Sequence, residues 1–280
     1  MTVPDIALHD GTSIPQLGFG VFQVPPPETA ATVAAALEAG YRHIDTAQMY
    51  GNEAGVGEAI KASGIARDDL YVTTKLNNGF HRPDDARREI DASLERLGLD
   101  QVDLFLIHWP LPTRYDGDFV QTWRALIEAQ EAGKTRSIGV SNFQPAHLDR
   151  IVEETGVVPV VNQVEVHPFF ANEDVRAADK RHGVLTEAWS PIAKGTVVDD
   201  DTIGEIASVV GRTPAQVALR WHVQRGDIVF PKSMNPERMR QNFEIFDFEL
   251  EPAHMSAIDE LDRGEAGRLG PNPDAFDWIP

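Results

Sequence analysis

The chain has 280 residues, a length at which α/β barrels commonly fold as one unit. Hydrophobic residues make up 42% and charged residues 25%, a balance typical of ordered globular proteins. The net charge of −19 argues against nucleic acid and anionic membranes as partners, and the absence of cysteine excludes disulfides and thiolate chemistry.

The amino-terminal sequence MTVPDIALHDGTSIPQLG has neither the basic segment nor the apolar segment of a secretory signal. No apolar run of 18 residues occurs anywhere in the chain. We therefore expect a soluble, cytoplasmic protein. Within this stretch, residues 6–17 predict a β-hairpin that turns at Asp10-Gly11.

Short apolar runs then alternate with helical patterns along the whole chain. Their near-continuous apolar character is typical of parallel strands that are covered on both faces. The predicted strands are 17–22, 43–47, 70–76, 102–109, 136–142, 160–166, 184–190 and 227–233.

The segments between these strands show the periodicity of amphipathic helices. One helix over 83–97 places four apolar residues on one face and ends at a capping Gly98: Ala86, Ile90, Leu94 and Leu97. A second helical pattern within 200–211 aligns Ile203, Ile206, Ala207 and Val210. A third is predicted to start with Thr213 as N-cap and Pro214 as first helical residue.

Eight strand–helix repeats without a linker predict a single (β/α)8 TIM barrel over residues 1–280. The amino-terminal hairpin and extra helices near the C-terminus would be additions to it.

Polar or aromatic residues end the predicted strands, at intervals of 22 to 43 residues. In a barrel all strand ends converge on one rim, where active sites are built. A single buried Asp or Lys is more often part of a structural ion pair, but seven such strand ends favour a functional site. These residues are Asp45, Lys75, His108, Ser141, Asn142, Gln163, Trp189, Ser190, Lys232 and Ser233.

Tyr50, five residues after Asp45, would complete a proton-donating group. A phenol has a pKa near 10, and lowering that pKa by two to three units requires about 3–4 kcal/mol of preferential stabilisation of the phenolate. The ammonium of Lys75, held by Asp45, would supply it, and His108 would direct an N–H at a carbonyl oxygen. The set predicts carbonyl reduction.

Reduction also needs a hydride, which no side chain supplies, so a nicotinamide cofactor is implied. The Gly18-Phe19-Gly20 stretch lacks the third glycine of a Rossmann fingerprint. The basic stretch 230–246 instead predicts phosphate binding by Lys232, Ser233 and Arg238, because a lone cation at a buried strand end would be costly. The alternative is an ordinary solvated helix face.

Three motifs resemble those of the aldo-keto reductase family: GYRHIDTAQMYGNEAGVGEAI, LDQVDLFLIHWP and VFPKSMNPERMRQN. The resemblance covers nearly the whole chain, and within the family it is strongest to the actinobacterial 2,5-diketo-D-gluconic acid reductases. It implies that Tyr50 is the general acid, that Lys75 and Asp45 lower its pKa, and that His108 orients the substrate carbonyl.

The resemblance also implies NADPH/NADP+ as the cofactor and assigns the residues that bind it. Ser141, Asn142 and Gln163 are expected to hold the nicotinamide carboxamide, with Trp189 stacked beneath the ring. The remaining contacts are expected along the pyrophosphate, at the 2′-phosphate and at the adenine: Ser190, Pro191, Ile192, Lys194, Gly195, Lys232, Ser233, Met234, Arg238, Gln241 and Asn242.

For the substrate the resemblance implies a pocket lined by Phe22, Asn77, His108, Trp109 and Trp278. Many relatives carry Trp where this chain has Asn77, which predicts a roomier and more polar pocket. Trp278, in the variable tail, would either close over the substrate or pack on the barrel. By strand alternation alone Trp109 would face away from His108.

The sequence has no paired metal-ligand spacing, and His167 is expected to be a packed loop histidine. Two other functions remain open: a Schiff-base aldolase barrel that uses Lys75 or Lys232, and an NADPH-binding sensor or accessory barrel with slow turnover. We expect a monomeric NADPH-dependent reductase of aldehydes or ketones, with keto-sugar acids and small dicarbonyls as candidate substrates.

Overall fold

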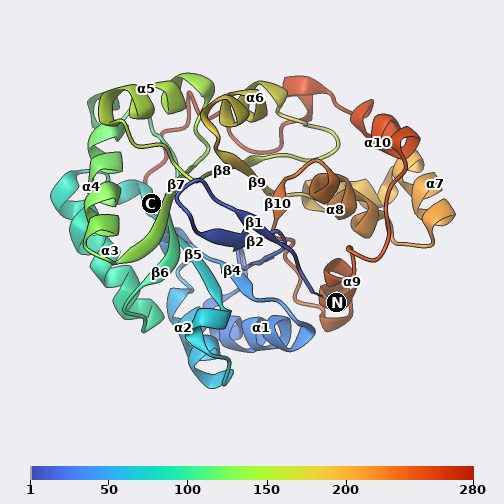
Figure 1. Cartoon of the computed structure of the whole chain (residues 1–280), viewed down its shortest axis with the longest axis horizontal. Coiled ribbons are helices and arrows are strands. Elements are labelled where there is room, and N and C mark those ends of the chain that lie inside the picture. The colour runs from blue at the N-terminus through green and yellow to red at the C-terminus, as the bar shows by residue number, and fades with distance from the viewer. Residues whose placement is uncertain (1) are drawn as a thin grey trace.

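A computed structural model describes residues 2–280, in which eight parallel strands form a barrel inside a ring of helices (Figure 1). Each strand pairs with the next one along the chain. The barrel strands are β3 (Phe19–Gly20), β4 (His43–Asp45), β5 (Tyr71–Leu76), β6 (Val102–Ile107), β7 (Thr135–Ser141), β8 (Val161–Glu165), β9 (Leu185–Trp189) and β10 (Ile228–Val229).

The first and last strands close the barrel through residues next to β3. Leu17 forms a parallel bridge with Val229, and the Gly18 N–H donates to the Val229 carbonyl at 2.8 Å. The predicted (β/α)8 barrel is therefore confirmed, with sequential strand order and a closed sheet.

The two strands at the closure are shorter than predicted. β3 keeps two residues of the expected 17–22, and β10 keeps two of the expected 227–233. Pro231 offers no N–H to a ladder, which limits β10. At Gly20 the backbones approach so closely that a Cβ would lie 2.9 Å from the Phe230 carbonyl oxygen, so only glycine fits there.

Helices follow the strands in the order that the sequence predicts, and two of them lie between β9 and β10, where the longest interval between strand ends left room. The helices are α1 (Pro26–Ala39), α2 (Glu53–Ala62), α3 (Pro83–Leu97), α4 (Phe119–Glu131), α5 (Pro145–Thr155), α6 (Glu173–His182), α7 (Asp201–Val210), α8 (Pro214–Gln224), α9 (Pro236–Phe243) and α10 (Pro252–Asp259).

The predicted helix signals are confirmed in the packing. All four apolar residues predicted on one face of α3 are buried against the barrel, and Gly98 ends the helix with φ 64°. In α7 the predicted face is also buried, except that Val210 is half-buried. Thr213 and Gln216 form a reciprocal capping box at the start of α8.

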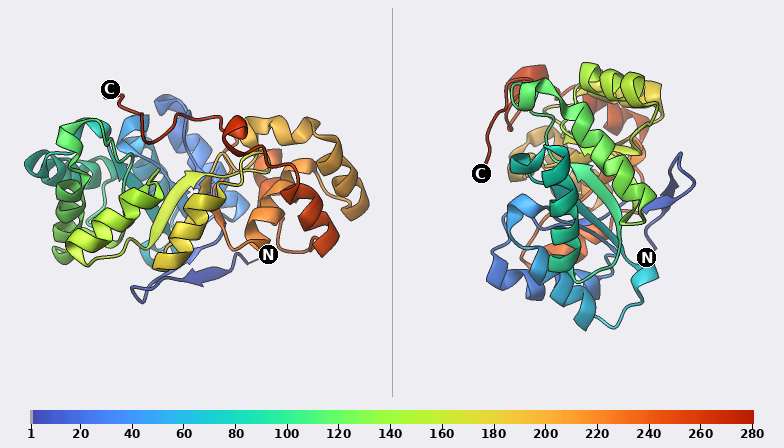
Figure 2. Two further views of the ribbon diagram at one scale, coloured as in Figure 1. Left: turned by 90° about the horizontal axis from the view of Figure 1, so that it is seen from above. Right: turned by 90° about the vertical axis from the view of Figure 1, so that its left-hand side faces the viewer.

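The amino-terminal hairpin consists of β1 (Asp5–Ala7) and β2 (Ser13–Pro15), which pair antiparallel as predicted. Its apolar residues Leu8 and Ile14 pack against Tyr71 and Phe230 in the barrel interior, so the hairpin covers the amino ends of the strands. Figure 2 shows the hairpin below the barrel and the carboxyl-terminal segment above it.

The carboxyl-terminal segment lies on the rim formed by the carboxyl ends of the strands. The Asn78 side chain donates to the Trp278 carbonyl at 2.9 Å, and Arg114 pairs with Asp277 at 3.0 Å.

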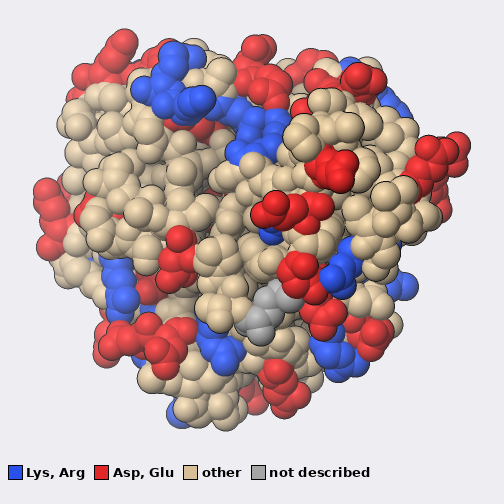
Figure 3. All heavy atoms as spheres, turned by 45° about the vertical axis from the view of Figure 1, so that its right-hand side comes forward, with Lys and Arg blue, Asp and Glu red and all other residues tan. Residues whose placement is uncertain are grey.

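Acidic side chains are spread over the surface in Figure 3, with Lys and Arg in smaller separate groups. No helix within residues 2–280 combines the length and apolar character needed to cross a membrane.

Candidate functional site

A buried ion pair lies at the centre of the rim. Asp45 is the last residue of β4, and Lys75 lies on the neighbouring β5 with its side chain fully buried. The Lys75 ammonium donates to both Asp45 carboxylate oxygens at 2.8 Å and to the Thr46 carbonyl at 2.9 Å. Two oppositely charged groups at this depth must be paired, because an unpaired charge away from water is costly.

Tyr50 folds back over this pair because the chain leaves β4 through a 3₁₀ helix, Gln48–Tyr50, which ends at Gly51 with φ 67°. The Tyr50 hydroxyl lies 3.5 Å from the Lys75 ammonium nitrogen. An ammonium has only donors, so the phenol oxygen is the acceptor in this contact and its own hydrogen remains free for another group.

Gln48 anchors the short helix that carries Tyr50. Its amide nitrogen donates to the Glu89 carbonyl at 2.9 Å, and its amide oxygen accepts from the Asn77 N–H at 2.7 Å. No role was predicted for Gln48 from the sequence, although it lies two residues before Tyr50 in the first family motif.

The ionisation of Tyr50 differs from the expectation. Burial raises the pKa of its phenol, Lys75 lowers it and Asp45 raises it again, and the resulting pKa lies above the usual value. The predicted lowering of the Tyr50 pKa was wrong for the protein alone. Burial has the largest effect on this pKa, and Asp45 cancels much of the opposing Lys75 charge. The phenol is therefore neutral at neutral pH.

His108 follows the last residue of β6 and lies against Tyr50, with ring centroids 5.6 Å apart. Burial and the Lys75 charge hold the pKa of His108 well below its usual value, so the imidazole is neutral. Its Nδ1 is buried without a hydrogen-bond partner among residues 2–280. A neutral imidazole beside a phenol can donate one N–H to an oxygen atom placed between them.

The residues predicted to hold a carboxamide are neighbours at the ends of β7, β8 and β9. Ser141 donates to the Gln163 carbonyl at 2.8 Å, and Trp189 donates from its indole nitrogen to the Asn142 side chain at 2.9 Å. The Asn142 amide also donates to the His108 carbonyl at 2.9 Å. The structure thus brings these four side chains together next to Tyr50 and His108.

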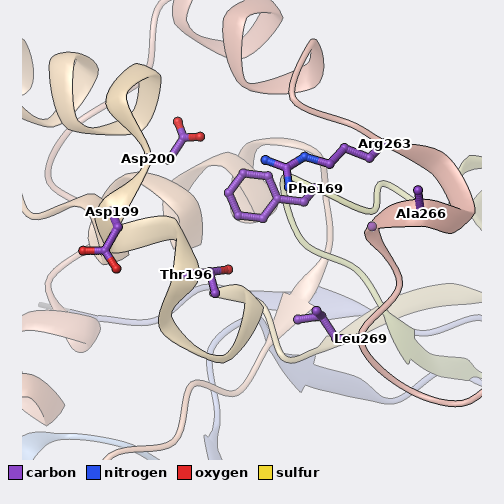
Figure 4. Close-up of a pocket in the computed structure, with 8 residues that line it drawn as sticks. Phe169, Thr196, Asp199, Asp200, Arg263, Ala266 and Leu269 are labelled. Atoms are coloured by element: carbon purple, nitrogen blue, oxygen red, sulfur yellow. The ribbon is translucent and has the colours of Figure 1, made fainter.

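The segment Ser190–Gly195 leaves β9 in a strained conformation, with φ of 52° at Ser190 and 54° at Lys194. Lys194 is exposed and donates to the Leu269 carbonyl at 3.4 Å. Beside this segment lies a cavity of about 270 Å³, in which Arg263 covers the Phe169 ring (Figure 4). After β9 the cavity is lined from Thr196 onward and not by the predicted segment itself.

The basic stretch after β10 is more exposed than predicted. Lys232 is exposed, so the argument that a buried lone cation requires a phosphate was wrong: β10 ends at Val229 and releases Lys232 to the surface. Arg238 is also exposed, on α9. Neither side chain pairs with a carboxylate within residues 2–280, whereas Arg240 pairs with Glu237 at 2.8 Å.

The other residues assigned to the adenine end lie on or beside α9. Ser233 is half-buried, Met234 is exposed, and Asn242 is buried. Gln241 donates to Glu237 at 3.3 Å and is half-buried. These four residues lie within residues 233–242, close in the chain to Lys232 and Arg238.

The aromatic residues predicted to line the substrate pocket have different surroundings in the structure. Phe22 is 56% exposed, and its ring centroid lies 5.1 Å from that of Tyr50. Trp109 packs against Phe276 of the tail at 4.1 Å between ring centroids. The alternation argument does not apply to Trp109, because β6 ends at Ile107. Trp278 is 53% exposed, and its backbone is tied to the rim.

Asn77 was predicted to line the substrate pocket, but in the structure its side chain contacts the local backbone. Its side-chain oxygen accepts from the Gly79 N–H at 3.0 Å and caps the 3₁₀ helix Asn78–Phe80. This oxygen therefore satisfies the local backbone rather than the pocket.

Two buried carboxyl groups near the rim were missed by the sequence analysis. Glu187 lies two residues before Trp189 on β9, so by strand alternation both side chains face the same side of the sheet. Glu165 accepts from the N–H groups of Leu269 and Gly270 at 2.7 and 2.9 Å and from His167 at 3.1 Å. His167 is thus a packed loop histidine, as expected. The sequence signal for Glu165 and Glu187 was a charged residue within an otherwise apolar strand.

The chain is similar in sequence to known proteins. A model of the Aldo/keto reductase family matches residues 16–263. The chain is 50% identical over 275 residues to an aldo-keto reductase of Mycolicibacterium smegmatis, with 98% of each chain covered. It is 48% identical over 276 residues to the methylglyoxal reductase DkgA of Yersinia pestis, with 98% of this chain and 97% of that one covered.

Solved structures agree with the sequence comparison. The apo crystal structure of Gox0644 superposes with a TM-score of 0.95 at 44% identity, covering 99% of this chain and 100% of that one. A variant of Gox0644 in complex with NADPH gives a TM-score of 0.94 at 44% identity and the same coverage.

Proposed function

The chain belongs to the aldo/keto reductase family, and from this we propose that it reduces aldehydes or ketones to alcohols with NADPH. The observation that carries the proposal is the Tyr50 hydroxyl, 3.5 Å from the Lys75 ammonium that Asp45 holds with both oxygens. Among the relatives, DkgA is named a methylglyoxal reductase, and a Gox0644 variant was crystallised with NADPH.

The Gln163 side chain offers a free hydrogen-bonding group to a nicotinamide cofactor. Both N–H groups of the Gln163 amide have carboxyl oxygens within reach, so its oxygen, which has no partner among residues 2–280, is left to accept from a carboxamide. Ser141 and Asn142 adjoin it, and Trp189 offers a half-buried indole face. When bound, NADPH supplies a hydride to the carbonyl carbon.

The surface cations fit the 2′-phosphate of NADPH. Lys232 and Arg238 stay without a carboxylate partner among residues 2–280, although the chain has a net charge of −19. Arg238 lies in the first turn of α9, where the Asn235 side chain already accepts from the N–H groups of Glu237 and Arg238, so the proposed contact falls to the two cationic side chains. We place Ser233 with them, the segment Ser190–Gly195 along the pyrophosphate, and Met234, Gln241 and Asn242 at the adenine.

In the proposed reaction Tyr50 gives its proton to the carbonyl oxygen. Its hydrogen is free because Lys75 takes the role of donor in their contact, and its raised pKa keeps it protonated at neutral pH. A raised phenol pKa still permits the transfer, since an alkoxide is a far stronger base than a phenolate. His108, neutral and adjacent, orients the same oxygen.

The surroundings of Tyr50 favour an uncharged substrate. Phe22 presents an exposed aromatic ring beside Tyr50, and we place Trp109 and Trp278 in the same pocket. The two cations tied to this region are already paired, Lys75 with Asp45 and Arg114 with Asp277. We therefore place a small dicarbonyl such as methylglyoxal, or an aromatic aldehyde, ahead of an anionic keto-sugar acid.

The aldolase alternative is disfavoured by the state of Lys75. Burial lowers the pKa of its ammonium, but Asp45 and Tyr50 raise it, and the resulting pKa lies above the usual value. A Schiff-base lysine must instead be a neutral amine. The slow sensor alternative keeps the same cofactor and differs only in rate.

The test follows NADPH oxidation with methylglyoxal, benzaldehyde and a keto-sugar acid, with NADH as the control cofactor. We expect turnover with NADPH and an uncharged carbonyl. Carbonyl-dependent trapping on the protein by borohydride, without NADPH oxidation, would establish the aldolase instead, and tight NADPH binding without turnover would establish the sensor.

We also propose that the chain is one cytoplasmic domain and a monomer. The barrel includes strands from both ends of the chain, closed by the bridge from Leu17 to Val229, which favours one cooperative unit. Light scattering at micromolar concentration is expected to give a mass near the 30.9 kDa of one chain.

A further inference from the structure

Glu187 lies inside the barrel, directly beneath the proposed nicotinamide site. It pairs in register with Gln163 on β8 and is fully buried. By alternation its side chain faces the same side of β9 as that of Trp189, so it belongs to the layer just below the rim.

Glu187 helps to set the direction of the Gln163 amide. The amide nitrogen lies 3.1 Å from a Glu187 oxygen and 3.0 Å from an Asp45 oxygen. A reversed amide would set its oxygen against the ionised Asp45, which is unfavourable. The Gln163 oxygen therefore points away from both carboxyl groups.

The charges around Glu187 leave it without a counterion. The groups that act on it electrostatically are Asp45 from β4 and Lys75 from β5, and Asp45 occupies the Lys75 ammonium with both oxygens. Tyr71, also from β5, lies within electrostatic range and is a neutral phenol with a pKa well above the usual value.

The remaining Glu187 oxygen, Oε1, is buried and has no hydrogen-bond partner among residues 2–280. Burial and the Asp45 charge raise the pKa of Glu187 to about 8. With Asp45 and Lys75 ionised and Glu187 protonated, this buried group of side chains is electrically neutral.

We propose that Glu187 is a positioning residue that orients the Gln163 amide toward the cofactor and loses its proton to solvent when the oxidised, positively charged nicotinamide binds. The inference rests on the proposed NADPH-dependent function. Its physical basis is electrostatic: a neutral dihydronicotinamide leaves the neutral side chains undisturbed, whereas a cationic ring favours the ionised Glu187 carboxylate.

The size of the effect follows from proton linkage. If the cationic ring lowers the pKa of Glu187 from about 8 to about 7, then binding at pH 7.5 releases about half a proton. At pH 9 and above Glu187 is mostly ionised before binding, so the release falls, and NADP+ binds about tenfold more tightly relative to NADPH than at pH 6.

The experiment is calorimetric titration of the full chain with NADP+ and with NADPH, in buffers of different ionisation enthalpy. Both nucleotides carry the same 2′-phosphate, so the difference in proton release between them isolates the charge of the ring. We expect about half a proton more with NADP+ at pH 7.5. The Glu187→Gln variant, which imitates the protonated carboxyl, is expected to lose this difference.

Asp179→Asn is the matched control. Asp179 is also buried and has a pKa raised to about 7 by burial, but it contacts Asn162 and Thr186 rather than Gln163. This variant is expected to keep the difference in proton release between the two nucleotides.

Equal proton release with both nucleotides in the wild type, or an unchanged difference in Glu187→Gln, would overturn the inference. The wild-type pH series alone decides the matter should Glu187→Gln fail to fold, because the difference must vanish above pH 9. If neither nucleotide binds the wild type, the proposed function fails as well. If both bind and NADPH is oxidised with methylglyoxal, but the difference is missing, only the role of Glu187 fails.

Discussion

Replacing Lys75 by Met separates the structural from the chemical role of the buried ion pair. Met keeps most of the volume of the side chain but removes the charge, which leaves Asp45, 3% exposed, with the Gln163 amide at 3.0 Å as a remaining donor. Removing one partner of a buried pair costs about 3–5 kcal/mol. We expect Lys75→Met to lower the free energy of unfolding by that amount.

The double variant Asp45→Asn/Lys75→Met removes both charges at once. Because neither charge then remains buried and unpaired, its loss of stability is expected to be at least about 2 kcal/mol smaller than the sum of the two single losses. NADPH-dependent turnover should stay low in all three variants, since each deprives Tyr50 of the held ammonium.

Urea unfolding followed by tryptophan fluorescence, together with NADPH oxidation at saturating methylglyoxal, measures both quantities. Arg87→Met is the control: Arg87 contacts Glu128 at a shorter 2.6 Å, but both side chains are about half exposed, so stability should hardly change. Additive losses in the double variant, or a Lys75→Met variant as stable as the wild type, would refute the reasoning.

Three further results are expected. Arg238→Ala should weaken NADPH binding about tenfold or more and NADH binding little. Arg240→Ala, which breaks an ion pair with Glu237 on the same helix, should affect neither strongly. Equal effects of Arg238→Ala on the two cofactors would exclude a role at the 2′-phosphate. Burial raises the pKa of Asp227, but hydrogen bonds from His222 and Arg176 outweigh burial and leave that pKa below its usual value. The ionised Asp227 therefore stabilises the fold above about pH 4, and this contribution is lost as the pH falls further. The stability gap between wild type and Asp227→Asn, measured by urea unfolding, should shrink below pH 4, and a constant gap would contradict this. Arg114→Ala should raise the KM for methylglyoxal more than it lowers kcat, by loosening the tail at Asp277, and an unchanged KM would remove the tail from the substrate site.

The barrel was predictable because its signals are local and repeated. Strand after strand reads as an apolar run, and caps such as Gly98 and Thr213 mark helix ends by their own backbone chemistry. The ends of β3 and β10 were not predictable, because they depend on how closely the two closing strands approach at Gly20.

The site was predictable as a set of residues but not in its electrostatics. The positions of Asp45 and Lys75 follow from their places at strand ends and that of Tyr50 from its spacing five residues after Asp45, and the structure brings all three together. The direction of the Tyr50 pKa shift depends on the balance between burial and two opposite charges, which only coordinates supply. The exposure of Lys232 likewise depends on where β10 ends.

The roles of Glu187 and Asn77 were not predicted, because they too depend on contacts that only coordinates supply. Glu187 carries no motif of its own, and its importance lies in a 3.1 Å contact to Gln163 across two strands. Asn77 was assigned to the pocket by its position, whereas its oxygen serves the cap of a short helix.

The most direct test of the account is the single-turnover rate of Tyr50→Phe at saturating NADPH and methylglyoxal. We expect that rate to fall about 10²–10⁴-fold, the range of a positioned general acid, with an NADPH dissociation constant within about twofold of wild type. Tyr115→Phe, which removes a rim hydroxyl that donates to the Asn78 carbonyl at 2.8 Å, should keep most of the rate. A Tyr50→Phe variant that reduces methylglyoxal at the wild-type rate would contradict the account.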